Sequence, residues 1–71
     1  MQNIFRERLT KTLEESEFPQ DKEERLVAFA KMFSIRRHEA NTILSGKAPA
    51  ADLLMKIADE FEVKPNWLLG K

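Results

Sequence analysis

The sequence has no cysteine, which excludes a disulfide framework, thiol catalysis and zinc sites built on cysteine. Its two glycines are isolated, so no glycine-rich loop is present to cradle a phosphate. The longest apolar run, residues 26–30, falls far short of the roughly 20 residues that a membrane-spanning helix needs. Neither sign of charge is in excess, because 12 basic residues balance 12 acidic ones.

The 71 residues suit one small domain spanning 1–71, and an apolar content of 42% is enough for a packed core. No basic and apolar signal segment opens the chain, so we expect the protein in the cytoplasm. A domain of this size buries only about 60% of the surface that its unfolded chain exposes. Because disulfides are absent, we expect a second copy of the chain to add stability.

Apolar residues recur at helical spacing along the whole chain, and no segment alternates with a period of two. The pattern predicts an all-α fold of five helices without a sheet. The first helix is predicted between an Asn3 cap and the Phe18-Pro19 stop, the second from an Asp21–Glu24 capping box to Phe33. The others are predicted over Arg36–Leu44, from Pro49-Ala50 to Phe61, and from Pro65 to Leu69. The inner faces are predicted to carry Ile4, Phe5, Leu9, Leu13 and Ser16, then Leu26, Phe29, Ala30 and Phe33, then Ala40, Ile43 and Leu44, and finally Leu53, Leu54, Ile57, Ala58 and Phe61.

Catalytic and metal-binding residue types are sparse. His38 is the single histidine, and only Glu39 lies near it in sequence, where adjacent helix positions point about 100° apart. The glutamates between residues 14 and 24 fall on predicted outer faces, where a run of charge is usually solvated surface. We therefore expect no enzymatic activity, no cofactor, no metal and no small-molecule substrate.

Charge is distributed unevenly along the chain. Residues 14–24 carry six acidic side chains against one lysine, whereas residues 25–47 carry five basic side chains against Glu39. The basic segment contains a tight junction between two predicted helices, which is the pattern of a helix-turn-helix. In that motif the N-terminal end of the second helix enters the DNA major groove. Here this end is Arg36-Arg37-His38-Glu39, and arginine forks match the two acceptors of guanine.

The same residues also have a plainer interpretation. Two arginines at a helix start are unfavourable to the helix dipole, so Arg36 and Arg37 are equally consistent with solvated surface residues. Glu39 is favourable at that position and is also able to accept a hydrogen bond from a cytosine amino group. Charge pattern alone therefore leaves DNA binding and a solvated surface as alternatives.

Two motifs bear on this choice. The first runs Phe29-Ala30-x-x-Phe33-Ser34-Ile35-x-x-x-x-Ala40-x-x-Ile43-x-x-Gly46-Lys47-x-Pro49. The second runs Leu54-Met55-Lys56-Ile57-Ala58-Asp59-x-Phe61-x-Val63-x-Pro65-x-Trp67-Leu68-Leu69-Gly70. Over about residues 24 to 70, they resemble the lambda-repressor-like helix-turn-helix proteins, the Cro and XRE-type family. The resemblance implies a compact five-helix DNA-binding domain that acts as a dimer on a palindromic operator.

The resemblance also implies roles for individual residues. The base-reading positions of the family fall on Arg37 and His38, with Arg36 beside them and Thr42 one turn further on. Asn41 is expected to share their exposed side and to read bases with them. Its phosphate-contacting positions fall on Arg25, Ser45, the Gly46 amide and Lys47. Trp67 and Leu68 give the chain an apolar C-terminal surface, where we expect the dimer interface.

The chain departs from the family pattern in several places. Leu26 stands where glutamine is common, so that contact is expected to be lost or taken over by Arg25. Ser34 replaces the turn glycine and is expected to adopt an unusual backbone angle or to reshape the turn. Arg36 replaces the serine or threonine cap of the third helix and cannot cap it. The loop after Lys47 is one residue shorter than in common members.

The sequence therefore predicts a helix-turn-helix transcriptional regulator, most simply a phage- or prophage-type repressor. It is expected to bind double-stranded DNA as a homodimer and to act by occluding a promoter. The alternative is a protein-interaction domain, such as the antitoxin half of a toxin–antitoxin pair. The neutral net charge and Leu26 in place of glutamine favour that alternative.

Overall fold

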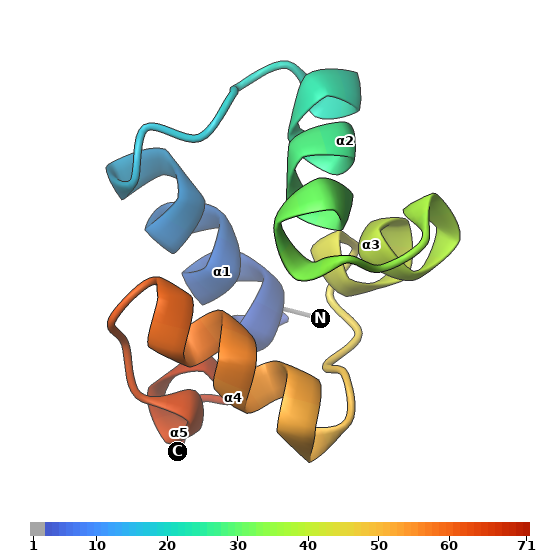
Figure 1. Cartoon of the computed structure of the whole chain (residues 1–71). Coiled ribbons are helices and arrows are strands. Elements are labelled where there is room, and N and C mark those ends of the chain that lie inside the picture. The colour runs from blue at the N-terminus through green and yellow to red at the C-terminus, as the bar shows by residue number, and fades with distance from the viewer. Residues whose placement is uncertain (1–2) are drawn as a thin grey trace.

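The computed structural model describes residues 3–71, which form five helices and contain no strand (Figure 1). These helices are α1 (Ile4–Glu15), α2 (Lys22–Phe33), α3 (Arg37–Leu44), α4 (Ala51–Glu60) and α5 (Pro65–Leu68). They form one compact body with a radius of gyration of 11.0 Å. The predicted all-α class and the number of helices are confirmed for the described residues.

Polar side chains start the first two helices as predicted. The Asn3 side chain accepts a hydrogen bond from the Arg6 backbone N–H at 2.9 Å, and the Asp21 carboxylate accepts one from the Glu24 N–H at 3.0 Å. The third helix starts at Arg37, one residue later than predicted. Arg36 has extended backbone and offers no side-chain acceptor, so it flanks the helix as an uncapped residue.

Each of the five helices is followed, one or two positions after its last residue, by a residue with a positive φ. These residues are Glu17, Ser34, Gly46, Glu62 and Gly70. In each case the next backbone N–H reaches back five residues, as in the bonds Phe18 to Leu13, Ile35 to Ala30 and Val63 to Ala58 at 2.9–3.0 Å. This is the Schellman arrangement, which satisfies carbonyl groups that a helix end leaves free.

Two predictions about helix ends are decided by this arrangement. Ser34 has φ 54° and ψ 45°, so the expected unusual backbone angle is confirmed. The predicted stop of α1 at Phe18-Pro19 is wrong, because α1 ends at Glu15 and Glu17 already has a φ of 60°. A left-handed residue therefore turns the chain before the proline restricts it.

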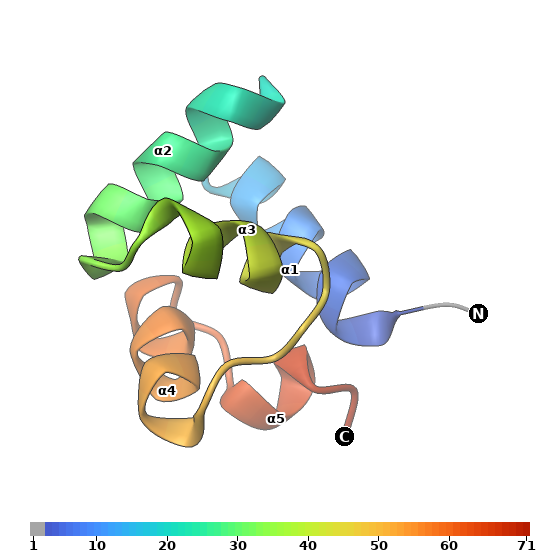
Figure 2. The same ribbon diagram turned by 90° about the vertical axis from the view of Figure 1, so that its right-hand side faces the viewer.

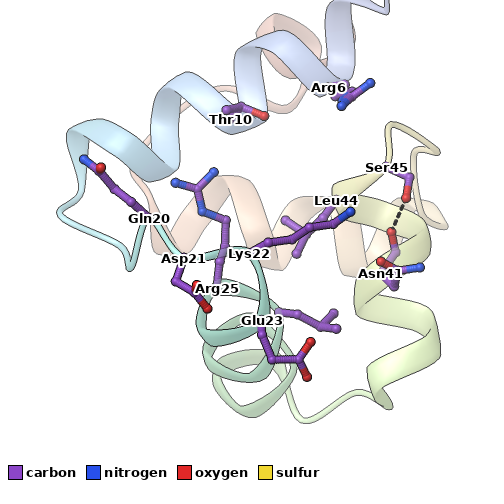
Figure 3. Close-up of a pocket in the computed structure, with 11 residues that line it drawn as sticks. Arg6, Thr10, Gln20, Asp21, Lys22, Glu23, Arg25, Asn41, Leu44 and Ser45 are labelled. Atoms are coloured by element: carbon purple, nitrogen blue, oxygen red, sulfur yellow. Dashed lines mark hydrogen bonds between the residues drawn. The ribbon is translucent and has the colours of Figure 1, made fainter.

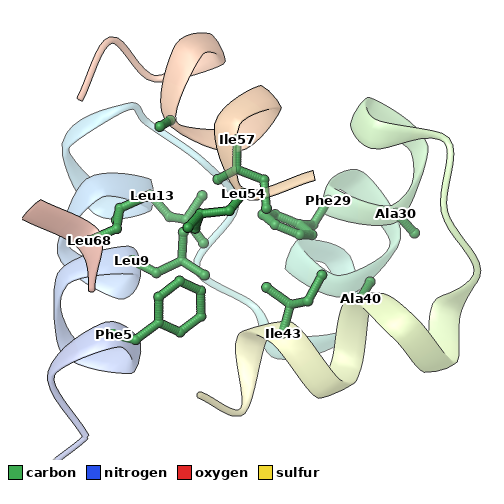
Figure 4. Packing of buried hydrophobic residues seen from close by; sticks show 11 residues of the cluster. Phe5, Leu9, Leu13, Phe29, Ala30, Ala40, Ile43, Leu54, Ile57 and Leu68 are labelled. Atoms are coloured by element: carbon green, nitrogen blue, oxygen red, sulfur yellow. The ribbon is translucent and has the colours of Figure 1, made fainter. Parts of the chain in front are cut away.

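Buried apolar side chains from all five helices form one core (Figure 4). Its members are Phe5, Leu9, Leu13, Phe29, Ala30, Ala40, Ile43, Leu54, Ile57, Ala58 and Leu68. The predicted inner faces of α2, α3 and α4 are confirmed, because their remaining members pack against this core as partly buried residues. Four phenylalanines surround the contact between α2 and α4, with ring centroids 4.9–6.4 Å apart, and these are Phe18, Phe29, Phe33 and Phe61.

The inner face of α1 differs from the prediction. Ile4 is 45% exposed and Ser16 is exposed, whereas Thr12 is buried and its hydroxyl donates to the Arg8 carbonyl at 2.8 Å. Positions 5, 9, 12 and 13 form the buried stripe, which is the i, i+4, i+7, i+8 pattern of a straight helix on a core. Thr12 is tolerated there because its own helix satisfies the hydroxyl.

The C-terminal helix, α5, lies against the first helix, α1. The Arg8 guanidinium lies 5.1 Å from the centre of the Trp67 ring and donates to the Trp67 carbonyl. A side chain at Gly70 would meet Ile4 at 2.8 Å. Arg8 therefore holds α5 against α1 through a cation–π contact and a hydrogen bond.

Ser34→Gly is expected to stabilise the protein by about 0.5–1 kcal/mol. Relief of the left-handed strain of a residue with a Cβ gains about 1–2 kcal/mol, and the larger entropy that glycine loses on folding costs about 0.5–1 kcal/mol. Denaturant unfolding followed by Trp67 fluorescence measures the change, since Trp67 is the only tryptophan. Ser45→Gly is the matched control and is expected to destabilise, because Ser45 has a φ of −76°. Equal effects of the two changes would contradict the strain at Ser34.

Candidate nucleic-acid interface

α3 is held by one face and exposed on the other. Its buried face carries Ala40 and Ile43, which are 0% and 2% exposed, and α2 is the element on which α3 packs most closely. Only residues 34–36 separate the two helices, so the start of α3 has little freedom relative to α2. Figure 2 views the molecule from the side on which the exposed face of α3 lies.

The predicted base-reading residues lie together on this exposed face. Arg36, Arg37, His38 and Asn41 are all exposed, and they occupy the first turns of α3 and the residue before it. Thr42 differs from them, because it is half-buried and its hydroxyl donates to the His38 carbonyl at 2.9 Å. The exposed face therefore presents two guanidinium groups, one imidazole and one amide.

An acidic residue from α2 also reaches this face. The Arg37 guanidinium forms an ion pair with the Glu23 carboxylate, and the two side chains are 63% and 64% exposed. Exposed pairs of this kind contribute at most about 1 kcal/mol, so the pair does not lock Arg37 in place. Nothing in the sequence pairs these residues, which are brought together by the packing of α2 against α3.

The residues expected to contact phosphate lie on α2 and just after the C-terminal end of α3. Arg25 is partly buried, and its Nε donates to the Pro19 carbonyl at 2.9 Å, which orients the guanidinium. Lys47 is exposed after the end of α3. The Ser45 hydroxyl donates to the Asn41 carbonyl at 2.6 Å. Its oxygen is therefore left as an acceptor rather than as a donor to an anion.

The expectation for the Gly46 amide is corrected by the structure. The Gly46 N–H donates to the Ile43 carbonyl at 3.0 Å, so it is used by the helix end rather than free for a phosphate. The Gly46 carbonyl accepts a hydrogen bond from the Asn3 side chain at 2.9 Å. A Cβ at Gly46 would lie 2.5 Å from that side chain. Gly46 thus positions the loop after α3 against the start of α1.

A groove of about 780 Å³ lies where α1, α2 and the end of α3 meet (Figure 3). It brings Arg25, Asn41 and Ser45 together with side chains for which the sequence predicts no role. These are Arg6 and Thr10 of α1 and Lys22 of α2. Helical periodicity places Arg6 on the outside of α1, and no local signal shows that this outside faces α2.

The two residues expected at a dimer interface have different surroundings. Trp67 is half-buried beneath the Arg8 guanidinium and keeps some exposed surface. Leu68 is 0% exposed in the single chain, so its side chain has no surface left for a second copy. This corrects the expectation for Leu68. The exposed apolar residue near α5 is Ile4, which lies beside Gly70.

Residues 3–71 offer little for other kinds of site. No three histidine, aspartate or glutamate side chains in this range gather as a metal-binding group. No helix formed by these residues is both long enough and apolar enough to cross a membrane. Comparison with known protein families, curated proteins and solved structures finds no match, so the site itself is the basis for a function.

Proposed function

We propose that this chain is a sequence-specific double-stranded DNA-binding protein that represses transcription by occupying an operator as a homodimer. The observation that carries the proposal is the exposed face of α3, with Arg37, His38 and Asn41 on a helix whose opposite face is fixed in the core and with Arg36 exposed just before the helix begins. The proposed role is binding rather than catalysis, and a regulator of this kind would act in the cytoplasm.

The dimensions and chemistry of α3 suit the DNA major groove. Its eight residues form an α-helix, which is about 10–12 Å across when its side chains are included. The major groove is about 12 Å wide and admits an α-helix. Arginine forks donate to both acceptors of guanine, and an amide such as that of Asn41 matches the edge of adenine. The side chains on α3 are therefore of the types that read bases.

The resemblance of residues 24–70 to the lambda-repressor-like family supports the same proposal. It makes the segment from α2 to α3 a helix-turn-helix, and it makes the whole chain a phage- or prophage-type repressor of the Cro and XRE class. The half-buried Trp67 and the exposed Ile4, both at the contact between α1 and α5, are the apolar residues that we propose for the dimer interface.

Selection of binding sites from random duplex DNA is the experiment that tests the proposed function. We expect one enriched sequence made of two inverted half-sites, with centres about 34 Å apart, or about one helical turn. Sedimentation should show a weak homodimer in free solution and two chains on each selected duplex. Failure to enrich any sequence would contradict DNA reading, and a single chain on each duplex would contradict the dimer.

The ion pair between Glu23 and Arg37 favours a second candidate function. The Glu23 carboxylate reaches the exposed face of α3, and its negative charge would oppose a phosphate backbone beside Arg37. A partner protein with its own basic residues would be attracted instead, as expected for the antitoxin half of a toxin–antitoxin pair. Titration with the selected duplex separates the two functions. The DNA-reading function expects the wild type to bind the duplex and the Arg37→Ala variant to lose that binding.

A further inference from the structure

The groove between α1, α2 and α3 is lined by three cationic side chains from two helices. Arg6 comes from α1, and Lys22 and Arg25 come from the first turn and a half of α2 (Figure 3). Thr10, Asn41 and Ser45 add polar groups along the same walls. Leu26 and Leu44, both half-buried, also line the groove. The groove thus combines positive charge with hydrogen-bonding groups.

These three cations have no carboxylate partner among the described residues. Among residues 3–71 the ion pair joins Arg37 to Glu23. Arg6, Lys22 and Arg25 therefore form no ion pair within the described residues. Arg25 donates through Nε to the Pro19 carbonyl, which holds its guanidinium over the groove and leaves the two terminal nitrogens available. A fixed guanidinium loses less conformational freedom on binding an anion than a free one does.

Two acidic residues also line the groove, and both are already engaged. The Asp21 carboxylate accepts the Glu24 backbone N–H at the start of α2. The Glu23 carboxylate pairs with Arg37. The positive charge therefore dominates in the part of the groove between α1 and α2, where Arg6, Thr10 and Arg25 lie.

We propose that this groove holds the phosphate backbone of one DNA strand, with Arg6 and Lys22 as phosphate-contacting residues beside Arg25. The inference rests on the proposed DNA binding and extends the interface from α2 and α3 onto α1. The groove adjoins the exposed face of α3, because Asn41 belongs to both, so a strand in the groove runs beside the bases that α3 would read. Each cation that neutralises a phosphate releases counterions and steepens the dependence of affinity on salt.

The test combines charge-removing variants with duplexes whose backbone is neutral at one position. Arg6→Gln and Lys22→Gln remove a cation from the groove. Lys11→Gln on α1 and Lys31→Gln on α2 are the matched controls, since both lysines are exposed and neither lines the groove. Each variant is titrated with the selected duplex at several salt concentrations. It is also titrated with duplexes that carry a single methylphosphonate in place of one phosphate.

For a dimer, Arg6→Gln and Lys22→Gln are each expected to lower the magnitude of the slope of log affinity against log salt by about 1.8, at roughly 0.9 per phosphate. Each variant should also lose its sensitivity to methylphosphonate at one position per half-site and keep it elsewhere. The control variants should match the wild type in both measurements. This positional readout does not follow from a change in stability, which would weaken binding to every duplex alike.

The groove proposal and the proposed function fail in different ways. The groove proposal alone is overturned if both groove variants keep the salt slope and the methylphosphonate sensitivity of the wild type while sequence preference still depends on α3. Absence of duplex binding by the wild type would overturn both. Inorganic phosphate is also added without DNA while the NMR signals of Arg6, Lys22 and Arg25 are followed. If these signals shift and the methylphosphonate profiles of the variants stay unchanged, the groove binds a free phosphate ion and the proposal is overturned.

Discussion

Arg37→Ala is expected to weaken binding to the selected duplex by about 1–3 kcal/mol, which is the discrimination supplied by one bidentate contact to a base. The same change should have a much smaller effect on a duplex of random sequence. Arg37 lies on the exposed face of α3, and its exposed ion pair with Glu23 is too weak to prevent a contact with guanine. Titration of both duplexes by fluorescence anisotropy, at one fixed salt concentration, measures the two losses.

Two further variants sharpen this prediction. Arg37→Lys keeps the charge and removes the planar fork, so it should lose preference for the selected duplex nearly as fully as Arg37→Ala. Glu23→Gln removes a negative charge from the same face and should strengthen binding to selected and random duplexes alike. An equal loss on both duplexes in Arg37→Ala would make Arg37 a phosphate contact instead of a base reader.

Phe29→Ala is expected to destabilise the fold by about 3–5 kcal/mol, the usual cost of truncating a buried phenylalanine. Phe29 is 0% exposed, and its ring lies 4.9 Å from the Phe33 ring and 6.4 Å from the Phe18 ring, measured between centroids. The cavity would open beneath the contact of α2 with α4, where side chains from three parts of the chain meet. A small domain has about 5–15 kcal/mol of total stability, so the loss is a large part of it.

Urea unfolding, followed by far-ultraviolet circular dichroism and by Trp67 fluorescence, measures the loss. Val27→Ala is the matched control on the same helix, because Val27 is 45% exposed, and it should stay within about 0.5 kcal/mol of the wild type. Phe29→Leu should fall between the two, because it keeps most of the apolar volume. An unfolding midpoint for Phe29→Ala equal to that of Val27→Ala would contradict the position of Phe29 in the core.

The helices and most of their core faces were predictable from the sequence because their signals are local. Asn3 and Asp21 accept hydrogen bonds from residues three positions later, so each cap can be predicted from residues within one helical turn. The buried residues of α4, Leu54, Ile57 and Ala58, follow the helical period. The left-handed angle of Ser34 was one of two outcomes expected from the resemblance, because Ser34 stands where that family has a turn glycine.

Helix ends without glycine were harder to predict from the sequence. Glu17 and Glu62 adopt the same left-handed conformation as Gly46, yet glutamate carries no signal for it. Their conformation is stabilised by the next residue in each case, because Phe18 and Val63 pack against the core and draw the chain back over the helix end. The tertiary contact therefore decides where these helices stop.

The candidate site divides in the same way. By itself, the sequence determined that Arg37, His38 and Asn41 lie near the start of a helix and outside the stripe of Ala40 and Ile43, because that follows from the helical period. Only the tertiary structure decided that Glu23 meets Arg37, that Arg6 and Lys22 share a groove with Arg25, and that Leu68 lies in the core. Those placements depend on how α2 packs against α3, how α1 packs against α3 and how α5 packs against α1. Helices pack against each other through interlocking side chains that are far apart in the sequence. The periodicity of apolar residues within one helix does not show which other helix that helix contacts.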